Sequence, residues 1–254
     1  MSAFVVEPAF WELFPDCEIG VLVIDHIDNT ELGNARARPA IDAELERANE
    51  LARRHLGAPV LSQNPVVAVW RDAFGKVRTK KGARASIEAL LPRVEKGRGV
   101  GPISPLVDIY NAISLEYGFP CGVEDIDTFV GVLRLTIASG GDTFRALGDE
   151  EESSTLDGEV CYLDDAGAVC RCWNWRDGER TMLTERTTRA VAIIESIDAS
   201  RHDEVLAALD ALAERVERHL AATISRRSIV TVDTPTVSLD PGVPVARSAT
   251  RSAT

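Results

Sequence analysis

The segment at residues 170–177 (CRCWNWRD) concentrates side chains that are suited to binding a ligand. It holds two tryptophans, two arginines and an asparagine within eight residues. Arginine offers a planar fork of donors that matches carboxylate and phosphate, asparagine both donates and accepts, and tryptophan presents a face on which a base or ring can stack. We expect this segment to line a ligand site. In a strand its side chains would alternate between two faces, one carrying Arg171, Trp173 and Trp175, the other Cys172, Asn174 and Arg176.

Positive charge is concentrated in a second segment. Residues 71–98 contain nine bases and three acids, a local net charge of +6 in a chain whose formal net charge is −12. The acidic total argues against a whole-surface nucleic-acid interface. Lys and Arg gathered on one patch bind phosphates by releasing counterions, whatever the base sequence. A solvated charged face is the alternative, but we expect RNA phosphates to contact Lys80, Lys81 and Arg84.

The sequence lacks the common motifs of nucleotide binding and nucleophilic catalysis. It has no Gly-x-Gly-x-x-Gly fingerprint and no P-loop, and none of its four histidines adjoins a nucleophile motif, so a serine or cysteine triad has no support. The five cysteines are not spaced as zinc knuckles, which predicts free thiols, no metal and no cofactor. An odd cysteine count without a secretory signal, and no apolar run of about 20 residues, indicate a cytoplasmic protein without a membrane span.

Hydrophobic periodicity predicts the elements that must position these segments. We expect strands at 18–25, 65–70, 130–138, 159–163, 168–175 and 189–197. We expect helices at 38–55, after a cap at Ser86, at 105–117 and at 203–224. This irregular alternation predicts one mixed α/β (α+β) domain with β-hairpins, not a doubly wound parallel sheet. We place the domain at residues 1–227 and expect the Ser-, Thr- and Pro-containing tail at 228–254 to be disordered.

Residues 107–125 carry a family resemblance. They contain an aspartate, an asparagine three residues later, a Leu-x-x-Gly-x-Pro turn and a final aspartate, at Asp108, Asn111, Leu115, Gly118, Pro120 and Asp125. The pattern resembles a signature of the editing, tRNA-binding domain of the beta subunit of bacterial phenylalanyl-tRNA synthetase. Residues 155–158 (TLDG) and 184–189 (TERTTR) resemble two later pieces of that domain in the right order. Because the rest of the synthetase does not follow, the resemblance indicates a freestanding version.

The resemblance implies a fold and a pocket. The fold is a three-layer domain with a β-sandwich-like core of unusual topology flanked by helices. The family's domain hydrolyses tyrosine wrongly esterified to tRNA. Its pocket asparagine matches Asn111, and the glutamate that contacts the tyrosine hydroxyl matches Glu195. The position of its editing histidine is occupied here by Gly122, and residues 173–178 replace its glycine-rich loop.

The residues and the resemblance together predict an aminoacyl-tRNA-binding protein that acts as a trans-editing hydrolase and deacylates mischarged tRNA. An aminoacyl ester is already activated, so positioning a water and stabilising the oxyanion can suffice. The predicted partner is the aminoacylated 3′ end of tRNA, with no membrane or DNA partner. The alternatives are a non-catalytic RNA-binding module and an amino-acid binder or small-molecule enzyme without RNA contact.

The expected site residues fall into three groups. For catalysis they are Asn111, Asn174 and Arg176. For contacts with the amino acid they are Arg171, Glu159, Glu195, Gly122 and Trp173, with Glu159 or Glu195 contacting an amino group or a side chain. For contacts with RNA they are Lys80, Lys81 and Arg84. The sequence specifies neither the amino acid, nor the tRNA, nor the oligomeric state.

Overall fold

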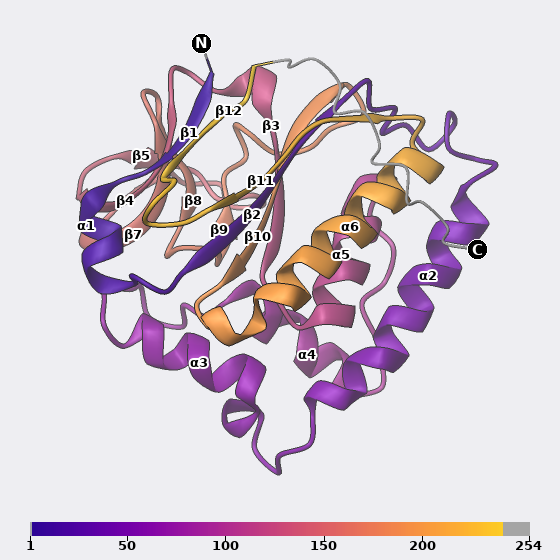
Figure 1. Cartoon of the computed structure of the whole chain (residues 1–254), viewed down its shortest axis with the longest axis horizontal. Coiled ribbons are helices and arrows are strands. Elements are labelled where there is room, and N and C mark those ends of the chain that lie inside the picture. Colours follow the sequence, from indigo (N-terminus) through magenta and orange to yellow (C-terminus); the bar gives the residue numbers. More distant parts are fainter. Residues whose placement is uncertain (1, 241–254) are drawn as a thin grey trace, which may run out of the picture.

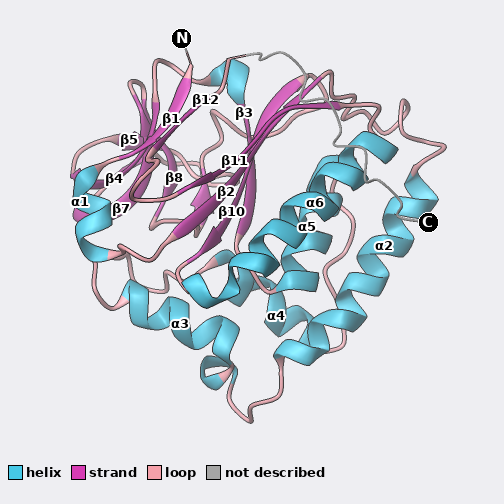
Figure 2. Cartoon of the chain, viewed as in Figure 1, coloured by secondary structure: helices cyan, strands magenta, loops and turns pink. Residues whose placement is uncertain are grey.

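The computed structural model describes residues 2–240, which form three layers (Figure 1). A six-stranded sheet faces a four-stranded sheet, and helices cover the outer side of the four-stranded sheet (Figure 2). The predicted mixed α+β architecture with a sandwich-like core is therefore confirmed. No helix within the described residues is long and apolar enough to cross a membrane.

The two sheets combine strands that are distant in sequence. The six-stranded sheet has the order β12 (Thr236–Ser238), β1 (Ala3–Val6), β4 (Leu133–Ser139), β7 (Asp157–Asp164), β8 (Gly167–Arg171) and β9 (Arg176–Asp177). Its β1–β4 pair is parallel, and the other neighbours are antiparallel. The four-stranded sheet is antiparallel, in the order β11 (Thr223–Val230), β2 (Glu18–Asp25), β10 (Arg189–Ser196) and β3 (Cys121–Asp125). The short strands β5 (Thr143–Phe144) and β6 (Ser153–Ser154) form a separate pair.

Three helices form the layer outside the four-stranded sheet. They are α2 (Arg38–Leu51), α5 (Pro105–Tyr117) and α6 (His202–His219). In this layer α5 and α6 pack on the sheet and α2 packs on α5. The remaining α-helices are α1 (Pro8–Leu13), α3 (Pro65–Phe74) and α4 (Ser86–Glu95). Four 3₁₀ turns lie at Ala52–His55, Leu61–Gln63, Ile126–Thr128 and Ala199–Arg201. Gly118, at φ 70°, ends α5 in the left-handed conformation that glycine adopts without steric cost.

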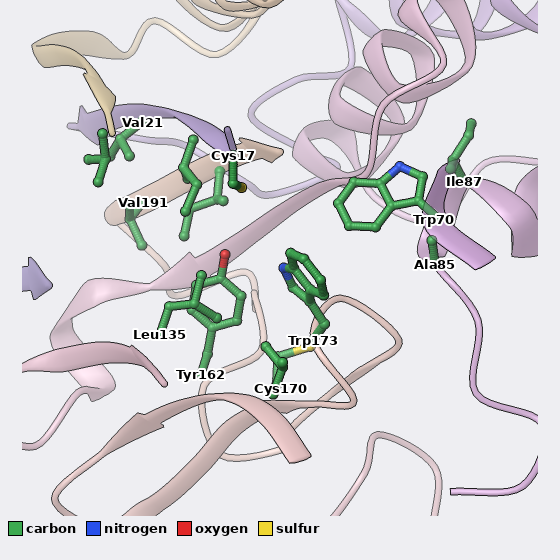
Figure 3. Close-up of a cluster of buried hydrophobic side chains, with 14 of the residues drawn as sticks. Cys17, Val21, Trp70, Ala85, Ile87, Leu135, Tyr162, Cys170, Trp173 and Val191 are labelled. Atoms are coloured by element: carbon green, nitrogen blue, oxygen red, sulfur yellow. The ribbon is translucent and has the colours of Figure 1, made fainter. Parts of the chain in front are cut away.

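Alternation along the strands separates two cores. Val191 and Ile193 on β10 point into the space between the sheets, whereas Ala190, Ala192 and Ile194 point toward the helices. Figure 3 shows the inter-sheet core, in which Val191 lies opposite Leu135 and Tyr162 of the six-stranded sheet. Glu195 has the same parity as Val191, so it also faces this core.

The predicted strand at 65–70 is wrong, because this segment begins helix α3. Its β-branched run favours a strand by composition. However, Val67, Trp70 and Ala73 recur every three residues and bury one face of a helix. Pro65 at the first helical turn has the backbone geometry of a helix start. The predicted cap at Ser86 is also wrong, since Ala85 holds the cap position and makes no side-chain capping bond.

The predicted domain end at residue 227 lies too early. Strand β11 continues to Val230, and β12 pairs with β1, so ordered sheet extends to residue 238. The Thr- and Val-containing sequence that resembles a disordered tail is also well suited to an edge strand. Residues 241–254 of the expected tail lie outside the described residues.

Candidate functional site

A cavity of about 80 Å³ lies between the two sheets, beside the segment predicted to bind a ligand. Strands β3 and β10 line one side with Cys121, Gly122, Glu124, Val191, Ile193 and Glu195. Strands β4, β7 and β8 line the other with Leu133, Tyr162, Val169 and Cys170. The lining is completed by Ser86, Asn174, Trp175 and Asp177. Apolar walls with a few placed polar groups are typical of small-molecule sites.

Glu195 is the centre of a hydrogen-bond cluster at this cavity. Its Oε1 accepts from the hydroxyl of Tyr162 at 2.5 Å and from the indole N–H of Trp173 at 2.7 Å. Its Oε2 accepts from the amide N–H of Asn174 at 2.5 Å. Figure 3 shows the indole nitrogen of Trp173 on the side toward the Tyr162 hydroxyl. Because a carboxylate has about four lone-pair sites, Oε2 can accept one further donor.

Two opposing effects set the pKa of Glu195. The carboxyl is 2% exposed, and this burial raises its pKa because the charged form loses hydration. The three hydrogen bonds stabilise the charged form and lower the pKa, and the balance lies at about 7. A carboxyl with this pKa gains and loses a proton at neutral pH, which is the property required of a general acid or base.

Residues 172–175 form a tight connection between β8 and β9, and not the continuation of a strand. The predicted alternation of residues 171–176 between two faces is therefore wrong. The φ angle is 46° at Cys172 and 65° at Trp173. Such left-handed conformations cost non-glycine residues about 1–3 kcal/mol each and persist only where surrounding contacts hold them.

Glu159 on β7 supplies those contacts. Its Oε1 accepts from Nε of Arg171 at 3.0 Å and from the backbone N–H of Cys172 at 2.8 Å, and its Oε2 accepts from Nη2 of Arg171 at 2.6 Å. Burial alone would raise the pKa of Glu159, but these bonds lower it to about 2. The expected substrate residues Arg171 and Glu159 thus form a buried ion pair that supports the connection and does not line the cavity.

Trp173 is buried in a cluster of aromatic rings and is 1% exposed. Its ring centroid lies 4.6–6.1 Å from those of Phe10, Phe14, Trp70 and Phe74. Such pairs contribute about 0.5–1.5 kcal/mol each beyond area burial. Because other rings enclose it, the ring of Trp173 has no free face on which a substrate could stack, contrary to the expectation from the sequence. Trp173 instead contributes to the site through its indole N–H, which donates to Glu195.

The basic segment is attached to this same connection. The backbone N–H of Lys80 donates to Sγ of Cys172 at 3.4 Å, and the backbone N–H of Ser86 donates to Oδ1 of Asn174 at 3.2 Å. The side chains of Lys80, Lys81 and Arg84 are exposed, and we call these three residues the basic turn. The structure thus places positive charge next to the loop that contacts Glu195.

Of the three remaining expected site residues, Gly122 lies at the cavity, whereas Asn111 and Arg176 are not part of its lining. Gly122 lines the cavity, and a Cβ at this position would meet no atom within 4 Å. Asn111 is buried in α5 and is not part of the lining. Arg176 is half-buried and pairs with Asp149 at 2.8 Å. Of the three expected catalytic residues, the structure therefore brings only Asn174 to the cavity.

Sequence reasoning missed Tyr162 and Glu124. Tyr162 lies between Cys161 and Leu163 in β7, where an aromatic residue is typical of a core position, and its contact with Glu195 joins two sheets that only the tertiary fold brings together. A signal did exist for Glu124. It lies two residues after Gly122 on β3, so the side chains at both positions face the same side of the sheet. Gly122 occupies the position that the resemblance assigns to the editing histidine, so Glu124 was identifiable as its neighbour on that side.

The cysteines do not form a reactive or metal-binding cluster. All five are buried and free. Burial raises the pKa of Cys172 to about 12 and that of Cys121 still further, which disfavours the nucleophilic thiolate. Within residues 2–240, no group of three or more His, Cys, Asp or Glu side chains is arranged to hold a metal ion.

Comparison with known proteins establishes the family. The model of the B3/4 domain family matches residues 69–234, which is more than half of the chain. The chain belongs to the B3/4 domain family. The matched residues include the basic turn, the signature in α5 and β3, residues 172–175 and Glu195. The predicted resemblance to the beta subunit of phenylalanyl-tRNA synthetase is confirmed.

The similar curated proteins are much longer than this chain. The phenylalanine–tRNA ligase beta subunit of Ruegeria pomeroyi is 39% identical over 89 residues, covering 35% of this chain and 11% of that protein. The Nocardia farcinica beta subunit is 44% identical over 72 residues, covering 28% and 8%. An N-terminal fragment of the Pyrococcus horikoshii phenylalanyl-tRNA synthetase beta subunit matches 90% of this chain and 50% of the fragment, with a TM-score of 0.46 and 10% identity. That last likeness is too loose to bear on function.

Proposed function

We propose that this B3/4 domain binds the aminoacylated 3′ end of tRNA and hydrolyses the ester of a mischarged amino acid. One observation carries the proposal: the loop that bears the basic turn is hydrogen-bonded to the connection that contacts Glu195. RNA phosphates would bind the basic turn while the esterified amino acid enters the cavity between the sheets. The similar proteins are named as tRNA ligase subunits, which supports a tRNA partner.

Glu195 acts as the general base in this proposal. Ionised Glu195 accepts a proton from water at Oε2, while the water oxygen bonds to the ester carbonyl carbon and an electron pair moves to the carbonyl oxygen. The intermediate then breaks its bond to the ribose oxygen, which takes the proton back. The products are a free amino acid and a tRNA with a terminal hydroxyl. This role differs from the side-chain contact implied by the resemblance, because a pKa of about 7 suits proton transfer.

Asn174 holds the base and the oxyanion in this mechanism. One amide N–H donates to Glu195, and Oδ1 accepts from the backbone of Ser86, so the orientation of the amide is fixed. The second N–H is the donor that we assign to the developing negative charge on the carbonyl oxygen. Arg171 and Glu159 act indirectly, by holding the backbone on which Asn174 is mounted.

A non-catalytic RNA-binding module is the second candidate, and Gly122 favours it. The resemblance places a catalytic histidine at this position, whereas glycine supplies no side chain to the cavity. A binding module would retain tRNA affinity through the basic turn without turning over the ester.

Incubation with a panel of correctly charged and mischarged tRNAs separates the two functions. We expect the wild-type protein to accelerate loss of at least one aminoacyl ester over the spontaneous rate. Glu195→Gln should reduce that rate about 10²-fold or more, which is the lower end of the usual range for general acid–base and oxyanion groups. tRNA binding without acceleration of any ester would support the binding module and reject the hydrolase.

A further inference from the structure

A second cavity, of about 320 Å³, lies beside the first and shares Glu124 and Asp177 with it. Its lining contains four acids and no base, and the acids are Glu31, Glu124, Asp177 and Glu185. Within residues 2–240, only Glu31 of these four forms an ion pair, with Arg38 at 3.3 Å. We call this cavity the acidic vestibule.

Glu124 has a polar atom without a partner at the junction of the two cavities. The residue is 8% exposed, and its Oε2 makes no hydrogen bond of normal length and angle with any of the described residues, although the nearby Thr181 hydroxyl lowers its pKa. Leaving such a group unpaired in the interior is unfavourable, and unsatisfied groups of this kind are rare in native proteins. Burial raises the pKa of Glu124 well above its ordinary value. A donor carried by a ligand would satisfy the oxygen, and a positive charge would stabilise the ionised carboxylate.

The remaining walls of the vestibule suit an aliphatic stem. Apolar side chains from α5, β3 and the segments near residues 147 and 183 line it, together with the ring of Tyr110. These side chains are Val107, Val123, Leu147, Met182 and Leu183. A chain of methylene groups that ends in a charged head packs its stem on such a surface while the head contacts the acid. The ring of Tyr110 also favours a cation near its face.

We propose that the acidic vestibule binds a primary alkylammonium group, whose ammonium donates to Oε2 of Glu124. Two sources share this chemistry: the side chain of a lysine-like aminoacyl group, and a free diamine. The first source rests on the proposed function, since it places the ester near Glu195 and the side chain toward Glu124. The two carboxyls face the same side of the sheet, and Glu124 pairs with Val191, four residues before Glu195. They are therefore roughly 13 Å apart along the strand direction, which leaves room for an extended aminoacyl group between them.

Calorimetric titration of the whole protein with small esters tests the vestibule without tRNA. Lysine methyl ester and norleucine methyl ester share a four-carbon stem, and only the first carries a terminal ammonium. We expect the lysine ester to bind at least about tenfold more tightly, the usual scale of one charge-assisted hydrogen bond. Equal affinities of the wild-type protein for the two esters would overturn the proposal, whatever the behaviour of any variant.

Glu124→Gln and a matched control locate the contact. Glu124→Gln should remove the preference for the lysine ester and leave norleucine ester binding unchanged. Glu46→Gln makes the same change of charge at an exposed position on α2 and should leave both affinities unchanged. A preference that survives in Glu124→Gln would overturn the proposal. 1,5-Diaminopentane distinguishes the sources: binding as tight as that of the lysine ester indicates a free amine, and weaker binding indicates an aminoacyl group.

The outcomes of this titration are separable from those of the deacylation panel. A lysine preference without hydrolysis of any charged tRNA would leave the vestibule assigned and reject the hydrolase. Hydrolysis of charged tRNA by a protein that binds both esters equally would reject the vestibule alone.

Discussion

Replacing Glu195 by Gln should abolish one part of the pH dependence of folding stability. The folded-state pKa of Glu195 is about 7, above its ordinary value of 4.5, because burial disfavours the charged form. The native state therefore binds more protons than the unfolded state between these two values. The stabilisation from Glu195 is complete below pH 4.5 and is lost as the pH rises through 7. At about 1.4 kcal/mol per pH unit, the loss amounts to about 3 kcal/mol.

The variant also carries a hydrogen-bond mismatch that does not depend on pH. If the new amide oxygen accepts from Tyr162 and Trp173, the new NH₂ group faces the amide donor of Asn174. Rotating the Asn174 amide moves the mismatch to the N–H of Ser86, which then lacks an acceptor. One opposed or unpaired buried donor costs about 1–3 kcal/mol at every pH. The variant should therefore be less stable than the wild type at pH 5, and at pH 8 it should be as stable as the wild type or up to about 2 kcal/mol more stable.

Urea denaturation of both proteins at several pH values from 5 to 8.5 measures this difference. All other titrating groups are shared, so they cancel when the free energies of unfolding are subtracted at each pH. We expect the free energy of unfolding of the wild type minus that of the variant to fall by about 2–3 kcal/mol from pH 5 to pH 8.5. Parallel stability curves for the two proteins would show that the folded state does not raise the pKa of Glu195.

Three further changes test other parts of the site. Neutralising the basic turn with three Gln substitutions should weaken tRNA binding and reduce the slope of log affinity against log salt by about 2–3; an unchanged slope would remove the turn from the interface. Arg171→Met should destabilise the fold by about 3–5 kcal/mol in thermal or urea unfolding, because it leaves Glu159 buried without its charged partner. Adding Glu159→Gln to this variant should restore part of the lost stability. Gly122→Ala should stabilise the strand by about 0.5–1 kcal/mol, because alanine loses less backbone entropy on folding. It should also slow ester hydrolysis, since the new methyl group points into open cavity space. Faster hydrolysis would show that the ligand does not use this space.

The sequence predicts the architecture better than it predicts the site. The amphipathic pattern of α6 reflects burial of one face, which is a local property of the sequence. The apolar spacing in α5 likewise predicts a helix, although the tertiary fold buries most of its residues. The strand at 65–70 failed because the same β-branched run also buries Val67, Trp70 and Ala73 on one side of a helix. Composition alone does not distinguish these two solutions, because the decision is made by packing against the rest of the core.

The site depends on contacts that no local pattern contains. The importance of residues 170–177 was predicted from their composition, but the turn at Cys172 depends on a carboxylate 13 residues earlier in the chain. Left-handed backbone at two successive non-glycine residues has no sequence signature, because tertiary contacts impose it. The donors to Glu195 likewise come from a facing sheet and its connection. Glu195 itself was found only through the resemblance, and its raised pKa follows from burial that appears once the sheets are packed.

The role of Glu195 as general base is tested by the pH profile of ester hydrolysis, measured for the wild-type protein and for Glu195→Gln. A charged tRNA that the wild-type protein deacylates would be mixed with excess protein, and the first-order rate of ester loss followed from pH 5.5 to 8.5 after subtraction of the spontaneous rate. We expect the wild-type rate to rise through a pKa of about 7. The residual rate of Glu195→Gln should lack this rise and be about 10²-fold lower above pH 7. Superimposable profiles for the two proteins would contradict this role of Glu195.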